Sequence, residues 1–147
     1  MKFLGPNLVA LNVRVDTPEE AIRKAGQLLL NQNHIYPSYI EAMVRSYRKN
    51  GPYFVLAPQI ALPHARPEDG AREASVSLVQ LAEPIEFGHK TNDPVRLVLA
   101  LGASNSDEHL EVLKKLMVLL GDKAIIEKMI HAKTYEEIEH FIRGVGA

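Results

Sequence analysis

Hydrophobic residues recur at helical spacing near the start of the chain. The residues from Thr17 to Glu20 form a capping box with proline at the first helical position. Ile22, Ala25 and Leu29 then follow at intervals that place them on one face of a helix. The pattern predicts a helix that begins just after Thr17 and buries this face.

Four further segments carry the same kind of signal. Ser38–Glu41 and Thr134–Glu137 are capping boxes, and Asn50-Gly51-Pro52 predicts the end of the helix that follows the first of them. Ser106 and Asp122 are suitable N-caps for two helices in between. The apolar positions that recur at helical spacing in these segments are Ile40, Met43, Val44, Tyr47, Leu110, Leu113, Leu116, Met117, Leu120, Ile125, Ile126, Met129, Ile130, Ile138, Phe141 and Ile142.

The middle of the chain contains short, nearly continuous apolar runs, at Tyr53–Leu56, Ile60–Leu62, Val76–Leu81 and Val95–Leu101. Proline, glycine and asparagine bound these runs, which is typical of strands covered on both faces. No repeat or linker interrupts the sequence. It therefore predicts one α/β domain over residues 1–147, with helices at both ends and strands between them.

Composition narrows the classes of function. The chain has 147 residues, 24% of them charged, and a net charge of -1, which gives no electrostatic reason to expect a nucleic-acid partner. It has no cysteine, so disulfides, thiolate nucleophiles and Cys-ligated zinc are excluded. The first residues lack a signal-peptide pattern, and no apolar run approaches the roughly 20 residues that cross a bilayer. These features predict a cytoplasmic protein without direct membrane insertion.

One histidine occupies a position suited to chemistry. His64 follows the predicted strand Ile60–Leu62 and precedes a turn at Pro67, and sites in α/β folds usually lie at strand ends. Pro63 has a fixed φ, which stiffens the backbone before the histidine. A neutral imidazole nitrogen is nucleophilic near pH 7 and suits reversible phosphoryl transfer. Taken alone, the short motif favours a surface-loop histidine with no chemical role over a functional one.

A second histidine and an arginine are candidates for binding phosphoryl oxygens. His109 lies in the first turn of the predicted helix, where N–H groups favour anions, although Asp107 and Glu108 oppose a bound phosphate there. Arg66 is two residues after His64 and suits bidentate binding of phosphate. The sequence has no GxxxxGK[ST] or GxGxxG motif, so phosphate is expected to arrive on another protein rather than on a nucleotide.

The other histidines give weaker signals. His34, His89, His131 and His140 show no metal-ligand spacing. A zinc site built from histidines 64, 89 and 109 also has no support in the spacing. We therefore expect neither a metal nor a cofactor.

The segment Gly51–Pro67 is similar to the active-site region of enzyme IIA domains of the mannitol/fructose class of bacterial sugar phosphotransferase systems, most of all to the ascorbate branch. Tyr39–Met43 resembles the second helix of that family, and Asn105–Leu113 resembles its NxxEHLxxL-like segment. The resemblance covers nearly the whole chain in the same order. It implies a mixed, mostly parallel sheet with helices on both faces.

The resemblance also implies a function for individual residues. In such domains the histidine of the PH motif, here His64, accepts a phosphoryl group at Nε2 from the phosphocarrier HPr and passes it to a cysteine of enzyme IIB. Enzyme IIB in turn serves the membrane component, enzyme IIC. The second active-site histidine maps onto His109. An arginine of mannitol-type members maps onto Arg48 when counted back from the histidine, and onto Ser46 when counted forward from the helix. The implied substrate is a sugar or an ascorbate-like compound.

Two rival functions remain open from the sequence. A regulatory phosphohistidine module of the same fold is usually attached to other domains, and the end of this chain at Ala147 favours a free-standing transport component. A metal-dependent hydrolase would require converging histidine or carboxylate ligands. A phosphoryl carrier instead predicts an exposed apolar rim around His64. Tyr53, Phe54 and Phe87 are candidates for it, although the sequence favours a core position for each of them.

Overall fold

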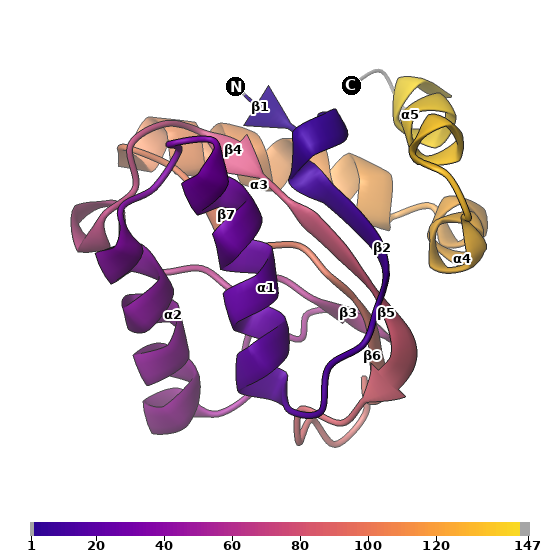
Figure 1. Cartoon of the computed structure of the whole chain (residues 1–147), viewed down its shortest axis with the longest axis horizontal. Helices are drawn as coiled ribbons and strands as arrows, with labels where there is room; N and C mark the ends of the chain where they lie inside the picture. The colour runs from indigo at the N-terminus through magenta and orange to yellow at the C-terminus, as the bar shows by residue number, and fades with distance from the viewer. Residues whose placement is uncertain (1, 145–147) are drawn as a thin grey trace.

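The structure is a computed structural model, and it describes residues 2–144. Strands lie between two layers of helices, with α1 and α2 on one face and α3 on the other (Figure 1). The strands are β1 (Lys2–Phe3), β2 (Val9–Val13), β3 (Ile60–Ala61), β4 (Ser75–Val76), β5 (Leu78–Ile85), β6 (Val95–Val98) and β7 (Leu101–Gly102). The helices are α1 (Pro18–Asn31), α2 (Pro37–Asn50), α3 (Ser106–Leu120), α4 (Lys123–His131) and α5 (Tyr135–Gly144), with short 3-10 turns η1 (Pro6–Leu8) and η2 (Pro67–Asp69).

The strands form two sheets of mixed direction, in the orders β1-β4-β7 and β2-β5-β6-β3. Strand pairs β1–β4, β2–β5 and β3–β6 are parallel, whereas β4–β7 and β5–β6 are antiparallel. In the larger sheet, Val79 is opposite Val98 and Ile60 is opposite Leu97. The expected mixed, mostly parallel α/β fold is confirmed. Of the domain predicted over 1–147, residue 1 and residues 145–147 lie outside the described residues.

Neighbouring residues of the central strands face opposite layers. Val79 and Val98 belong to the core shared with α1 and α2, while Leu78 and Leu97 belong to the core shared with α3, α4 and α5. All four side chains are fully buried. Because successive side chains of a strand point to opposite faces, a strand covered on both sides is apolar throughout, as the run Val95–Leu101 is.

Helix α1 begins where the sequence predicts. The hydroxyl oxygen of Thr17 accepts a hydrogen bond from the Glu20 N–H at 3.2 Å, and the Glu20 carboxylate accepts one from the Asp16 N–H at 3.0 Å. Its apolar face is completely buried, with Ile22 and Leu29 at 0% exposure.

Helix α2 begins one residue before the predicted capping residue Ser38. Pro37 takes the first helical position, where its missing N–H costs no hydrogen bond, and Tyr36 is the N-cap. The Ser38 hydroxyl instead donates to the carbonyl oxygen of Asp69 at 3.0 Å. The helix ends at the predicted place, with Gly51 in a conformation of φ +75°.

The starts of the last three helices agree with prediction except in one detail. Asp122 and Thr134 accept hydrogen bonds from the first turns of α4 and α5. For α3, the N-cap is Asn105 rather than Ser106, because the amide side chain of Asn105 accepts from the Glu108 N–H at 2.9 Å. The inner face of α3 agrees only in part with the expected set: Leu116 is buried as predicted, but Leu110 and Met117 are about half exposed, and Val112 and Leu119 are buried in their place.

The strand predictions were partly wrong. Tyr53–Leu56 is not a strand but a turn that follows α2, in which Phe54 is buried edge-on to Tyr47 and Phe87. Strands β1 and β2 were not predicted, so the chain begins with strands rather than with a helix. The single polar residue of Val9–Val13, Asn12, interrupts its apolar pattern; it has φ +54° and lies in an irregular part of the pairing with β5.

A buried glutamine connects distant parts of the fold. The side-chain oxygen of Gln80, in β5, accepts from the Asn12 N–H at 2.9 Å. Its amide nitrogen lies 2.8 to 3.1 Å from the carbonyl oxygens of Met129, Ile130 and Ala132 at the end of α4. The last carbonyl groups of a helix have no partner within the helix, so Gln80 donates hydrogen bonds to buried carbonyl groups that water cannot reach.

No helix within residues 2–144 combines the length and apolar character needed to cross a membrane.

Candidate active site

His64 lies just beyond β3 on backbone held by the neighbouring strands. The Leu99 N–H donates to the carbonyl oxygen of Ala61 at 2.9 Å, and the Leu101 N–H donates to that of Pro63 at 3.2 Å. The pairing of β3 with β6 therefore continues past the end of β3. Together with the fixed φ of Pro63, it holds the backbone up to the histidine.

The imidazole of His64 is also held in one orientation. Its Nδ1 lies 2.8 Å from the carbonyl oxygen of Leu62. A carbonyl oxygen only accepts hydrogen bonds, so Nδ1 carries the hydrogen and Nε2 carries the lone pair when the ring is neutral. The half-buried ring lines a surface hollow. This arrangement presents one defined nucleophilic nitrogen.

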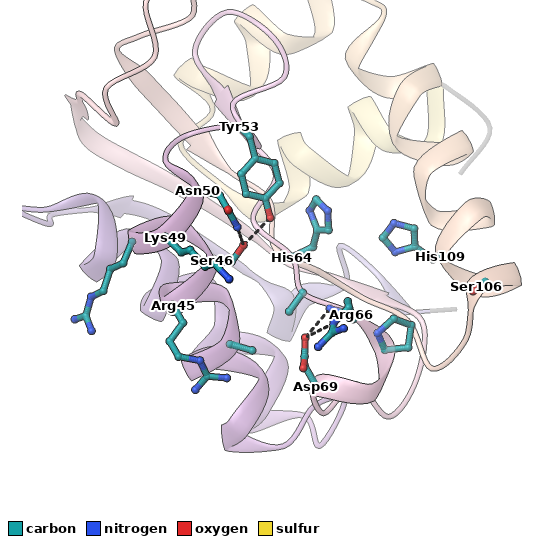
Figure 2. Close-up of a pocket in the computed structure, with 14 residues that line it drawn as sticks. Arg45, Ser46, Lys49, Asn50, Tyr53, His64, Arg66, Asp69, Ser106 and His109 are labelled. Carbon is teal, nitrogen blue, oxygen red and sulfur yellow. Dashed lines mark hydrogen bonds and ion pairs between the residues drawn. The ribbon is translucent and has the colours of Figure 1, made fainter.

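His109 lies beside His64, as the sequence analysis anticipated. The two ring centroids are 5.5 Å apart, and the rings come from different elements, since His109 is in the first turn of α3 (Figure 2). Burial, and secondarily the nearby His64, lower the pKa of His109 from its ordinary value. A lowered pKa keeps the ring neutral at a pH where an exposed histidine would begin to charge.

The hollow that both histidines line has a volume of about 1060 Å³, and several positively charged side chains line it. Arg45 and Lys49 of α2 line it together with Arg66, and among residues 2–144 Asp69 is the single carboxylate that does so. The Arg66 Nε lies 3.5 Å from Asp69 Oδ2, and the Arg66 N–H donates to the same oxygen at 3.0 Å. Figure 2 shows Arg66 and Asp69 beneath the two histidines; Arg66 precedes η2 and Asp69 is its last residue. The lining suits an anionic group.

Arg48 lines the same hollow, but its guanidinium group is paired elsewhere. Its Nη2 donates to Glu19 Oε2 at 2.8 Å and its Nε donates to Glu19 Oε1, so the pair is bidentate across α1 and α2. Lys49 is offset from Arg48 by about 100° around the helix and shares a face with Arg45. Neither Arg45 nor Lys49 was singled out from the sequence as a candidate site residue. Their i, i+4 spacing was the available signal.

Of the three aromatic candidates for a rim around His64, Tyr53 is on the surface, whereas Phe54 and Phe87 have the core positions that the sequence favoured. Tyr53 is 45% exposed, its ring lies edge-on to His64 with centroids 6.1 Å apart, and its hydroxyl is 2.9 Å from that of Ser46. Phe54 and Phe87 are buried in the core, where they pack against each other.

The remaining histidines do not assemble into a metal site. The Nδ1 of His89 accepts from the N–H groups of Thr91 and Asn92 within its own loop. Throughout residues 2–144, no three histidine, aspartate or glutamate side chains gather closely enough to hold a metal ion. The converging ligands required by the hydrolase hypothesis are therefore not found in this part of the chain.

The α/β fold and the paired histidines are the features expected of an enzyme IIA domain, and comparison with known families agrees. The model of the family described as phosphoenolpyruvate-dependent sugar phosphotransferase system, EIIA 2, matches residues 2–144. The chain belongs to this family.

Individual relatives extend the comparison. The chain is 34% identical over 133 residues to the ascorbate-specific PTS system EIIA component of Salmonella typhimurium, covering 90% of this chain and 86% of that protein. Among solved structures, it is similar to the mannitol-specific cryptic enzyme IIA CmtB of Escherichia coli, with a TM-score of 0.86, 32% identity, and 95% and 94% of the two chains covered. It is also similar to the E. coli enzyme IIAMTL solved in complex with phosphorylated enzyme IIBMTL, with a TM-score of 0.84, 31% identity, and 97% and 99% covered. The resemblance inferred from the sequence is confirmed.

Proposed function

We propose that this chain is a cytoplasmic phosphoryl carrier that works through a phosphohistidine at Nε2 of His64. The observation that carries the proposal is the hydrogen bond from His64 Nδ1 to the Leu62 carbonyl oxygen, at 2.8 Å. It fixes the tautomer in which Nε2 holds the lone pair and keeps that nitrogen oriented within the cationic hollow.

The transfer is a displacement at phosphorus. The Nε2 lone pair of His64 forms a new P–N bond while the P–N bond of a donor phosphohistidine breaks, and the bonding electron pair leaves with the donor imidazole. The second step reverses the roles: a cysteine thiolate of the acceptor forms a P–S bond, and the electron pair returns to Nε2. No cofactor takes part in either step.

Nearby side chains stabilise the phosphoryl oxygens in this proposal. His109 donates a hydrogen bond from a ring nitrogen, and Arg66 supplies positive charge beside His64. The pair with Glu19 occupies Nε and Nη2 of Arg48, so these two donors bind the phosphoryl group only after the guanidinium group leaves Glu19. Arg45 and Lys49 add to the positive potential of the hollow.

The partners follow from the family. We propose phospho-HPr as the donor and an enzyme IIB as the acceptor, which serves a membrane enzyme IIC. The similarity to an enzyme IIA that was solved bound to phosphorylated enzyme IIB supports the second partner. The ascorbate-specific relatives support uptake of ascorbate or a chemically similar compound.

A reconstituted phosphorylation reaction tests the carrier. The protein is incubated with enzyme I, HPr and phosphoenolpyruvate, and an acid-labile phosphate is sought by mass spectrometry. We expect one phosphate on the wild-type protein and none on His64→Ala. His89→Ala is the matched control, because the Nδ1 of His89 already accepts hydrogen bonds within its own loop. This variant should be labelled like the wild type.

Two outcomes would contradict this proposal. Unchanged labelling of His64→Ala would exclude His64 as the carrier. A labelled wild-type protein that passes no phosphate to a purified ascorbate-type or mannitol-type enzyme IIB would favour the regulatory alternative. The ratio of the transfer rates to these two enzymes IIB reports the substrate class.

A further inference from the structure

Tyr39 of α2 reaches the backbone on the far side of His64. The side chain is 1% exposed, and its hydroxyl oxygen accepts from the Ala65 N–H at 3.0 Å. The same hydroxyl lies 2.7 Å from the carbonyl oxygen of Leu101 and 3.2 Å from that of Ala65. A phenol has one hydrogen, so it donates mainly to the nearer oxygen, that of Leu101, while it accepts from Ala65.

Leu101 thereby anchors the chain on both sides of the histidine. Its N–H donates to the Pro63 carbonyl oxygen directly before His64, and its carbonyl oxygen accepts from Tyr39, which binds Ala65 directly after it. The peptide units that flank His64 are thus both connected to Leu101 of β7 by hydrogen bonds. The connection before His64 is direct, and the connection after it runs through the Tyr39 hydroxyl.

The loop beyond Ala65 is fastened to the same end of α2. The Ser38 hydroxyl donates to the Asp69 carbonyl oxygen, and the Tyr36 N–H donates to that of Gly70 at 2.8 Å. A Cβ atom at Gly70 would lie 2.6 Å from the Ser38 hydroxyl oxygen, so only glycine allows the loop to approach this closely. The first turn of α2 therefore holds the whole loop after His64.

We propose that Tyr39 is a positioning residue for phosphoryl transfer, acting through Ala65 and Leu101 to hold the His64 ring in its reactive orientation. This inference rests on the proposed function, since it concerns the same site. Tyr39 contacts no reacting atom. Its contribution is to restrict the movement of the backbone that carries the nucleophile, and small displacements of a reacting group cost large factors in rate.

The phenol remains a donor at every pH of interest. Burial raises the pKa of Tyr39 to about 12, so the hydroxyl keeps its hydrogen. A phenylalanine at this position fills nearly the same space but leaves the Ala65 N–H and the Leu101 carbonyl oxygen without this partner. Tyr39→Phe therefore loses the hydrogen bonds that hold the backbone after His64 and keeps the packing of the ring.

The test compares Tyr39→Phe with Tyr47→Phe. Tyr47 lies on the same helix, and its phenol also donates to a backbone carbonyl, that of Phe87 at 2.7 Å, but it has no tie to the residues that flank His64. Both variants lose one phenol hydroxyl and keep the ring. We measure the His64 ring signals by long-range ¹H–¹⁵N NMR, and the rate of phosphorylation over a range of phospho-HPr concentrations.

We expect Tyr39→Phe to lower the maximal rate by about tenfold with KM for phospho-HPr unchanged, the size of effect that loss of one well-formed hydrogen bond produces. Its His64 Nδ1–H population should fall, and the ring signals should broaden. Tyr47→Phe should match the wild type in rate and in the His64 signals. Thermal melting of both variants shows whether each is folded.

The inference is overturned if the two variants give the same His64 ring signals, or the same maximal rate. A wild-type protein that accepts no phosphate would instead refute the proposed function. In that case the NMR comparison still decides whether Tyr39 positions the ring, so the two failures are distinguishable.

Discussion

The imidazole rings of His64 and His109 lie 5.5 Å apart, one beyond the end of a strand and the other in the first turn of a helix. Burial is the main cause that lowers the pKa of His109 from 6.5, and the neighbouring His64 is the second. The pair thus combines one ring held by the Leu62 carbonyl oxygen with a second ring whose pKa is lowered.

The titration of His109 should reflect both causes. We expect its NMR midpoint to lie below 6.5, and to rise part of the way back in His64→Gln, because that variant removes the second cause and leaves the burial. The measurement is the Cε1–H shift of His109 as a function of pH. A midpoint above 6.5 would contradict the burial argument.

The same lowered pKa makes stability depend on pH. Between pH 6.5 and the lower folded pKa of His109, the unfolded chain binds the proton more readily than the folded one, so falling pH favours unfolding. This contribution is present above pH 6.5 and is lost as the pH falls through the folded pKa. In urea unfolding, the free energy of unfolding of the wild type relative to His109→Gln should therefore decrease as the pH falls. A difference that grows on acidification would show the opposite sign.

The tautomer of His64 is open to direct observation. The neutral ring should carry its hydrogen on Nδ1, because that atom is 2.8 Å from the Leu62 carbonyl oxygen. Long-range ¹H–¹⁵N spectra distinguish the two tautomers by the chemical shifts of the ring nitrogens. A majority of the Nε2–H form would leave the phosphoryl acceptor nitrogen protonated, contrary to the proposed function.

The arginines should differ in their importance for the transfer. Arg66→Gln is expected to slow phosphorylation of the protein by about tenfold, since it removes a charge beside His64. Arg48→Gln should have a smaller effect, because Glu19 already binds that guanidinium group. Glu19→Gln releases Arg48 and serves as the matched test. If Arg48 is recruited during transfer, Glu19→Gln will raise the rate, and Arg48→Gln will cancel that increase.

The contact between α1 and α2 should not tolerate a larger residue at Gly26. A Cβ atom there would lie 2.8 Å from Cγ1 of Ile40 and 3.0 Å from Cε of Met43. Alanine usually stabilises a helix by about 1 kcal/mol relative to glycine, but overpacking costs about 1–3 kcal/mol. We expect Gly26→Ala to lower the free energy of unfolding. In the control Gly5→Ala, the new Cβ meets nothing within 4 Å and φ is -69°, so stability should be retained.

The sequence was most informative where a signal is local. Thr17, Asp122 and Thr134 cap their helices as predicted, because a cap depends on residues within a single turn. Ser38 is not the N-cap because the helix already begins at Pro37, and its hydroxyl donates to the carbonyl oxygen of Asp69, which is distant in sequence. The buried turn after α2 was mistaken for a strand because Phe54 is apolar for a tertiary reason, its packing against Phe87.

The candidate site shows the same division. His64 became a candidate through its strand-end position and the family resemblance, and His109 through a helix-start pattern and the same resemblance; the structure places their rings 5.5 Å apart. The surroundings of the basic side chains depend on how α2 is rotated about its axis. This rotation places Arg48 against Glu19, and it places Lys49 on the same helix face as Arg45, beside the hollow. Tyr39 carried no signal of its own, because a buried tyrosine on an apolar helix face looks like any core residue until its hydroxyl partners are known.

Gln80 ties the stability of separate regions of the chain to one another. Its side chain bonds the Asn12 N–H of β2 and the last carbonyl groups of α4, which lie at opposite ends of the sequence. Opening of α4 would leave the buried amide without acceptors, so local unfolding there carries the cost of disturbing β2 as well. Hydrogen exchange at Asn12 and in α4 should therefore follow a single opening event, and the carrier should unfold and refold as one cooperative unit.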